Sequence, residues 1–174
     1  KNEVIDSKYK NKKIIIAIGR LTKQKNFSLL LHCFALIKKK YPDYHLLILG
    51  SGEEENELKQ TIYNMGISNS VDLLGFKENP YKYLNKAECF ILSSLWEDPG
   101  FVLLEAAYLN IPIIASNCPN GPAEILQNGL GGFLFKNNNQ NELIEAFDRF
   151  LRCPKTDLKI KKIIAKKYSK KFTK

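Results

Sequence analysis

The chain has 174 residues, of which 44% are hydrophobic and 26% charged, and its formal net charge is +9. This length supports one domain with a substantial core, and no apolar stretch approaches the length of a membrane span. The charge is concentrated in residues 155–174, which hold nine lysines and one aspartate and leave the first 154 residues near about +1. The basicity therefore belongs to the tail and does not mark the body as a nucleic-acid-binding domain.

The cysteines Cys33, Cys89, Cys118 and Cys153 stand far apart and form no CxxC pair. This spacing favours reduced thiols in a cytoplasm over a disulfide framework or a zinc site. Cys33 and Cys89 lie in apolar runs, so we expect them in the core. Cys118 lies in a turn, where it is either inert or reactive. Because the first residue is lysine, we expect the chain to be a fragment or a processed form.

Six apolar runs have the composition of β-strands. They are continuous and rich in β-branched residues, as is typical of strands that are buried on both faces. The runs are residues 14–19, 45–50, 71–76, 88–94, 111–117 and 131–136. Helical spacing or helix-start signals mark the segments between and after them, which are residues 27–42, 51–66, 80–87, 99–110, 121–129 and 139–151.

Strands and helices thus alternate along the chain with short connections. This order predicts an α/β fold, a Rossmann-like three-layer α/β/α domain with a six-stranded parallel sheet, over residues 1–154. Asn26 is expected to cap the first helix, and Asp98, followed by Pro99, the fourth. Residues 155–174 are expected to form a basic amphipathic helix that docks on the body, on a further domain or on an anionic membrane.

Ligands of such sheets bind beyond the carboxyl ends of the strands. The first strand is followed by GRLTKQKN, which lacks the GxGxxG fingerprint of dinucleotide-binding domains. Arg20 and Lys25 are two cations in this segment, and they either bind phosphate oxygens or are solvated. After the second strand, Gly50 and Gly52 permit a tight turn or a close approach of the backbone to a ligand.

The stretch WEDPGFVLLEA follows the fourth strand and carries acids on both sides of a helix start. The first amides of this helix, at Gly100, Phe101 and Val102, lack partners within it and suit a phosphate. Glu97 and Glu105 would repel a phosphate, but a carboxylate can accept hydrogen bonds from two neighbouring sugar hydroxyls. The alternative is that Glu97 interacts with the helix dipole and Glu105 is solvated.

The combination of GRLTKQKN, GSGEEENEL, LLGF, EDPGFVLLEA and NGPAEIL resembles the C-terminal, donor-binding half of GT-B glycosyltransferases of family 4. The likeness runs over residues 13–152, and its most specific part is the pair Glu97 and Glu105 with seven residues between them. Members of this family transfer a sugar from a nucleotide-sugar with retention and without an obligatory bound metal. Two departures are that Asp98 and Pro99 precede Gly100 where many relatives have glycine earlier, and that Asn26 often corresponds to glycine.

The resemblance implies catalytic roles for Glu97, Arg20 and Lys25. The glutamate would contact the transferred sugar, and the two cations would bind the donor diphosphate. The resemblance, together with the glycine at the second strand end, gives a donor-binding set of Gly19, Arg20, Lys25, Gly50, Phe76, Lys77, Glu97, Gly100, Phe101, Val102 and Glu105. His32 and His45 are not expected to be catalytic.

Further roles follow from the same resemblance. The backbone at Phe76 and Lys77 would lie beside the nucleobase, and the amides of Phe101 and Val102 would face the distal phosphate. Glu105 would hold the ribose hydroxyls. No metal and no cofactor other than the nucleotide-sugar co-substrate is implied.

The resemblance implies a UDP-sugar as the donor, since CPNGPAEIL is similar to relatives that use UDP-linked N-acetylhexosamines. The acceptor, a saccharide or a lipid-linked sugar in polysaccharide or glycolipid synthesis, would bind an N-terminal domain that this chain lacks. The chain alone would then bind the donor weakly and transfer nothing. A cytoplasmic location, with peripheral contact to the inner membrane face as a further alternative, fits this role. The competing functions are a nucleotide-sugar epimerase domain of GT-B type and a non-catalytic nucleotide-binding module, and no nucleic-acid partner is expected.

Overall fold

A computed structural model of the protein describes residues 7–98 and 100–172. Its strands are β1 (Lys13–Ile18), β2 (Tyr44–Leu49), β3 (Val71–Leu73), β4 (Ala87–Leu92), β5 (Ile113–Asn117) and β6 (Phe133–Lys136). They form one sheet in the order β3-β2-β1-β4-β5-β6, in which every pairing is parallel. The predicted α/β fold with a six-stranded parallel sheet is confirmed, although β3 is shorter than the apolar run that predicted it.

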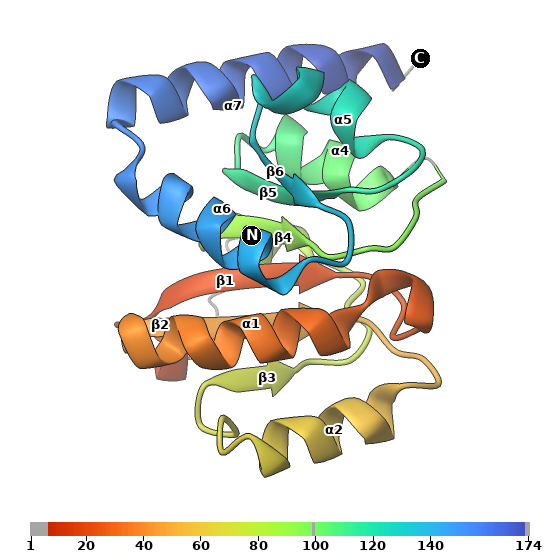
Figure 1. Ribbon diagram of the computed structural model, residues 1–174, viewed down its shortest axis with the longest axis vertical. Helices are drawn as coiled ribbons and strands as arrows, with labels where there is room; N and C mark the ends of the chain where they lie inside the picture. The colour runs from red at the N-terminus through yellow and green to blue at the C-terminus, as the bar shows by residue number, and fades with distance from the viewer. Residues whose placement is uncertain (1–6, 99, 173–174) are drawn as a thin grey trace.

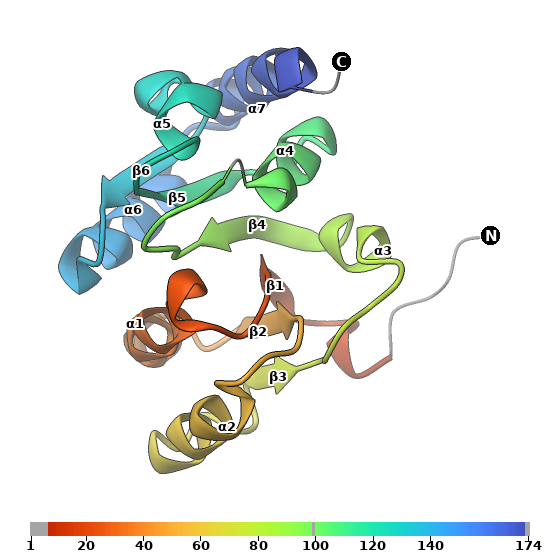
Figure 2. The same ribbon diagram turned by 90° about the vertical axis from the view of Figure 1, so that its right-hand side faces the viewer.

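The helices cover both faces of this sheet (Figures 1 and 2). They are α1 (Phe27–Lys40), α2 (Glu55–Asn64), α3 (Tyr81–Leu84), α4 (Phe101–Tyr108), α5 (Pro122–Ile125), α6 (Gln140–Arg152) and α7 (Lys155–Ser169). Short 3₁₀ turns are η1 (Ser7–Tyr9), η2 (Lys23–Lys25), η3 (Gln127–Gly129) and η4 (Lys170–Phe172). Within the described part of the chain, no helix combines the length and apolarity that crossing a membrane requires.

Successive strand residues pack into two separate cores. In β1, Ile15 and Ala17 join the core beneath α1, α2 and α6, whereas Ile14 and Ile16 join the core beneath α3, α4, α5 and α7. All four side chains are at most 2% exposed. Each fully buried isoleucine contributes about 1.5–3 kcal/mol to folding. Burial on both faces explains why the strands read as continuous apolar runs.

Of the two predicted helix caps, Asn26 stands at the N-cap position of α1 but makes no side-chain cap bond, and the cap at Asp98 is wrong. Asn26 precedes α1 in a left-handed conformation with φ 50°, and its side chain makes no cap bond but donates to Asn138 Oδ1 at 3.0 Å. A capping side chain normally belongs to a residue with extended backbone angles, which Asn26 does not have. Helix α4 begins at Phe101 and its N-cap is Gly100 with φ 74°, so Asp98 is not the cap. Pro99 lies outside the described residues.

The centre of the sheet is a topological switch point. β1 and β4 are neighbours, but β1 leads to α1 on one face and β4 leads to α4 on the other. Where neighbouring strands send their connections to opposite faces, the connections diverge and leave a crevice at the carboxyl edge of the sheet. The segments 19–26 and 93–98 meet at this point.

Candidate functional site

Hydrogen bonds join the segments that follow β1 and β4. The amide of Leu95 donates to Gln24 O at 2.8 Å, and the side-chain amide of Gln24 donates to Trp96 O at 3.0 Å. The hydroxyl of Ser93 donates to Lys25 O at 2.8 Å. These bonds fix the two segments relative to each other, so their side chains form one preorganised group.

A buried ion pair lies at the centre of this group. Lys25 Nζ is 2.7 Å from Glu97 Oε1 and 2.9 Å from Oε2, and the side chains are 15% and 3% exposed. The hydroxyl of Ser94, a fully buried residue, also donates to Glu97 Oε1. The amide of Glu97 donates to Pro119 O at 3.1 Å. A buried charge is tolerated only when it is paired and hydrogen-bonded, and both conditions hold here.

Two glycines lie against the ion pair, and a third contacts one of them. A Cβ on Gly19 would lie 3.0 Å from Lys25 Cε, and one on Gly100 would lie 3.5 Å from Glu97 Oε2. Gly50 has φ 140°, and a Cβ there would lie 1.8 Å from Gly19 O. The backbone angle and the contact with the neighbouring loop therefore already require glycine at position 50, which favours the tight turn over contact with a ligand as the reason for this residue. The five residues form one contiguous set.

The start of α4 adds backbone donors beside Gly100. Leu103 donates its amide to Gly100 O at 2.9 Å, whereas the amides of Phe101 and Val102 have no acceptor among the described residues. The Phe101 side chain is 65% exposed, and Val102 is half-buried against the core. The two amides are thus donors at the positive end of the helix dipole.

The remaining predicted site residues lie on the connections that leave β1, β3 and β4. Arg20 is exposed directly after Gly19, and among the described residues its guanidinium has no hydrogen-bond partner. Glu105 is half-buried in α4 and accepts a hydrogen bond from the Tyr81 hydroxyl at 3.3 Å. Phe76 is 73% exposed and Lys77 half-buried, both in the connection from β3 to α3.

The structure therefore separates the predicted residues into two groups. Gly19, Lys25, Gly50, Glu97 and Gly100 are in contact, and we call them, with Ser94, the carboxyl-edge cluster. The other predicted residues make none of the contacts described for this cluster, and they are Arg20, Phe76, Lys77, Phe101, Val102 and Glu105. They flank the cluster on the connections that leave β1, β3 and β4.

Sequence reasoning missed the serines and Tyr81. Ser93 and Ser94 end an otherwise apolar run, and two hydroxyls at the carboxyl end of a buried strand were the available signal. Nothing local marks Tyr81, because its contact with Glu105 spans 24 residues. Cys118 is buried, and burial together with the negative charge of Glu97 raises the pKa of its thiol to about 11. This thiol is protonated at neutral pH, which favours the inert alternative.

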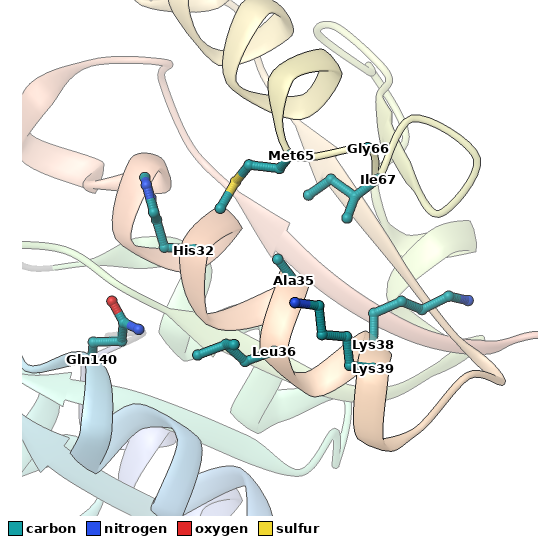
Figure 3. Close-up of a pocket in the computed structure, with 9 residues that line it drawn as sticks. All are labelled: His32, Ala35, Leu36, Lys38, Lys39, Met65, Gly66, Ile67 and Gln140. Atoms are coloured by element: carbon teal, nitrogen blue, oxygen red, sulfur yellow. The ribbon is translucent and has the colours of Figure 1, made fainter.

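A hollow of about 580 Å³ lies on the opposite side of α1 from the sheet (Figure 3). Its walls come from α1, the turn after α2 and the start of α6, and the lining residues include His32, Lys39, Met65 and Gln140. None of its lining residues belongs to the carboxyl-edge cluster.

A second charged cluster lies at the amino edge of the sheet. Asp72 accepts hydrogen bonds from His45 Nε2 at 2.7 Å, the Tyr9 hydroxyl at 2.9 Å and Lys8 Nζ at 3.0 Å. Burial lowers the pKa of His45, and the hydrogen bond to Asp72 only partly opposes this effect. Among the described residues, His45 Nδ1 is a buried atom without a partner. We call these four residues the amino-edge cluster.

The fold and the carboxyl-edge cluster define an α/β domain that presents a paired lysine and free helix-start amides at its switch point. The chain belongs to the glycosyl transferases group 1 family, whose model matches residues 1–167.

Curated relatives agree with this assignment. An uncharacterized glycosyltransferase of Methanocaldococcus jannaschii is 42% identical over 129 residues, which cover 72% of this chain and 32% of the relative. A Campylobacter jejuni relative is 33% identical over 143 residues, which cover 82% of this chain and 38% of the relative. Its name is N-acetylgalactosamine-N,N'-diacetylbacillosaminyl-diphospho-undecaprenol 4-alpha-N-acetylgalactosaminyltransferase. The chain thus spans only about a third of the length of these relatives.

Solved structures show the same fold. Anabaena HepE in complex with UDP and glucose superposes with a TM-score of 0.81 at 22% identity, covering 92% of this chain and 44% of HepE. The pneumococcal O-GlcNAc transferase GtfA, in complex with UDP and GlcNAc, superposes with a TM-score of 0.79 at 22% identity, covering 94% of this chain and 33% of GtfA.

Proposed function

We propose that the chain is the donor-binding domain of a retaining glycosyltransferase of family 4 and that the carboxyl-edge cluster binds a UDP-sugar. The observation that carries the proposal is the buried Lys25–Glu97 pair, which lies against Gly100 and next to the free amides at the start of α4. The presence of UDP in the HepE and GtfA complexes supports the choice of nucleotide.

The hydrogen-bonding capacity of the ion pair is not exhausted. An ammonium group has three N–H donors, and Glu97 accepts from Lys25 with both oxygens, which leaves one donor for a phosphate oxygen. Oε1 also accepts from Ser94, whereas Oε2 has Lys25 as its one donor among the described residues. Oε2 therefore has a free lone pair on the side where Gly100 lacks a Cβ, and a sugar hydroxyl can donate to it.

The same residues stabilise the charge that develops during transfer. Breaking the bond between the sugar and the diphosphate builds negative charge on the leaving phosphate. Lys25, held in place by Glu97, and the amides of Phe101 and Val102 would then be donors that need no reorganisation. Arg20, exposed at the rim, adds a second cation that can contact two phosphate oxygens at once.

The outer parts of the donor would lie on the flanking residues. Glu105 would accept hydrogen bonds from the ribose hydroxyls, with Tyr81 orienting its carboxylate. The backbone of the connection from β3, at Phe76 and Lys77, would lie beside the nucleobase. Gly19 and Gly50 would keep the loops close enough for Lys25 to reach the diphosphate.

We further propose that the acceptor, a saccharide or a lipid-linked sugar, binds an N-terminal domain outside this chain. The names of the relatives support this, since they include an undecaprenol-linked acceptor and a poly(glycerol-phosphate) alpha-glucosyltransferase. The enzyme would serve cell-surface polysaccharide or glycolipid synthesis in the cytoplasm, at the inner face of the membrane. The chain on its own would bind the donor and transfer nothing.

Calorimetric titration of the purified chain with UDP-GlcNAc, UDP, GDP and NAD tests the proposal. We expect binding of UDP and UDP-GlcNAc but not NAD, and we expect Arg20→Ala and Glu105→Ala each to weaken it about tenfold, as loss of a charge-assisted hydrogen bond does. Both side chains are at least partly exposed, so the midpoint of urea unfolding should change little. The matched control is Lys23→Ala, an exposed cation in the same loop. Unchanged affinity in both variants would refute the site.

A further inference from the structure

The outward face of α7 exposes two large apolar side chains. Ile160 and Ile163 are each 56% exposed, whereas the buried positions of the helix are the small residues Ala165 and Ser169. Residues spaced three and four apart share one face of a helix, so Ile160, Ile163 and Lys167 form a row. Ile164 is half-buried, whereas Ile160 and Ile163 lie side by side in water, and a contiguous exposed apolar patch bordered by polar residues is typical of an interaction surface.

Lysines border the two isoleucines. Lys159 and Lys167 are exposed beside the isoleucines, and in the sequence Asp157 is the single acid between residues 155 and 172. We call Lys159, Ile160, Ile163 and Lys167 the α7 stripe. Other lysines of the helix are engaged with the body: Lys161 donates to Gly129 O at 2.7 Å. The positive charge that α7 presents to solvent therefore includes Lys159 and Lys167, which lie beside the exposed isoleucines.

The neighbourhood of the stripe adds further apolar surface. Leu130, which is 63% exposed, follows the glycine that binds Lys161. Tyr108, 53% exposed, lies beneath Lys166, whose Nζ is 5.0 Å from the centre of its ring. Figure 1 shows α7 at one end of the molecule, beyond α4 and α5, and Figure 2 shows it at the same end beside α5. The stripe is therefore exposed at this end of the molecule.

We propose that the α7 stripe docks on a membrane surface rich in anionic lipids. The lysines match the negative charge of such a surface, and the isoleucines can enter the boundary between headgroups and acyl chains. Each lysine near an anionic surface strengthens binding by about fivefold. A nucleic-acid site would instead place aromatic or hydrogen-bonding side chains between the cations. This inference is independent of the donor site, which lies on connections that leave β1, β3 and β4.

Vesicle co-sedimentation of the purified chain tests the inference. We expect binding to phosphatidylcholine vesicles that contain about 30 mol% phosphatidylglycerol, and binding at least about tenfold weaker to pure phosphatidylcholine. Lys159→Glu with Lys167→Glu, and separately Ile160→Ser with Ile163→Ser, should each reduce binding about tenfold or more. Because all four side chains are exposed, circular dichroism should show that both double variants are folded. The lysine variant and the isoleucine variant then test the charge and the apolar contribution to binding separately.

Matched controls separate the stripe from net charge and general apolarity. Lys10→Glu with Lys12→Glu makes the same charge change ahead of β1, and Tyr63→Ser removes an apolar side chain that is 74% exposed on α2. Both controls should retain binding. Equal loss in the controls, or unchanged binding in the stripe variants, would overturn the inference. So would gel filtration showing a dimer that Ile160→Ser with Ile163→Ser converts to a monomer, because the stripe would then bind a second copy.

Discussion

The two charged clusters occupy opposite edges of the same sheet and differ in how completely they are satisfied. At the carboxyl edge, Lys25 and Ser94 donate to both oxygens of Glu97, and the pair lies at the switch point next to glycines. At the amino edge, Asp72 is also well hydrogen-bonded, but its partner His45 leaves a buried nitrogen unpaired. Similar chemistry thus gives a preorganised site at one edge and a pH-sensitive contact at the other.

The largest expected effect comes from removing one charge at the carboxyl edge. Lys25→Met leaves Glu97 buried without its cation, and we expect the free energy of unfolding to fall by about 3–5 kcal/mol. Urea unfolding followed by circular dichroism measures this loss. The double variant Lys25→Met with Glu97→Gln should recover part of it, because neither charge then remains buried.

The control for this experiment is Lys23→Met, which removes an exposed lysine two residues earlier and should change stability by less than about 0.5 kcal/mol. If Lys25→Met loses no more free energy of unfolding than Lys23→Met, the buried pair at the carboxyl edge does not depend on its lysine, and the proposed difference between the two edges is wrong.

A smaller effect is expected at the amino edge, as a dependence of stability on pH. With Nε2 donating to Asp72, His45 must take up a proton at Nδ1, a buried atom with no acceptor among the described residues. The pKa of folded His45 is therefore lowered, so its contribution is complete above about pH 6.5 and is lost as the pH falls through the lowered value. Each unit of lowering corresponds to about 1.4 kcal/mol.

Urea unfolding between about pH 8 and pH 5 measures this dependence, and His45→Gln should flatten it while leaving UDP binding by the folded protein unchanged. Stability that rises as the pH falls through this window would contradict the assignment. A pH dependence in the His45→Gln variant as steep as in the wild type would place the titrating group elsewhere.

The smallest effect is expected at the contact between α3 and α4. Tyr81→Phe removes the 3.3 Å hydrogen bond to Glu105, which is partly solvated, so stability should change by less than about 0.5 kcal/mol. If Tyr81 orients Glu105 toward a ribose, the affinity for UDP should fall about two- to threefold, as calorimetry can show. A loss as large as that of Glu105→Ala would give Tyr81 a direct contact with the nucleotide.

Much of the fold could be predicted because its signals are local. The continuous apolar runs predicted all six strands, and their alternation with helices predicted a parallel sheet. The prediction of the helix starts was less successful, since Gly100 rather than Asp98 precedes α4. Backbone angles at a helix start depend on how the preceding loop packs, and here that loop carries Glu97 to its contact with Lys25.

For the candidate site, the sequence by itself determined which residue types stand at the strand ends, because parallel strands bring their carboxyl ends to one edge. Only the tertiary structure decided which of them meet. The bond between Lys25 and Glu97 spans 72 residues, and the one between Tyr81 and Glu105 spans 24. The tertiary structure also decided that Glu97 is buried and that Ile160 and Ile163 are exposed. Burial depends on how distant segments pack, and the spacing of residues along the chain does not record this packing.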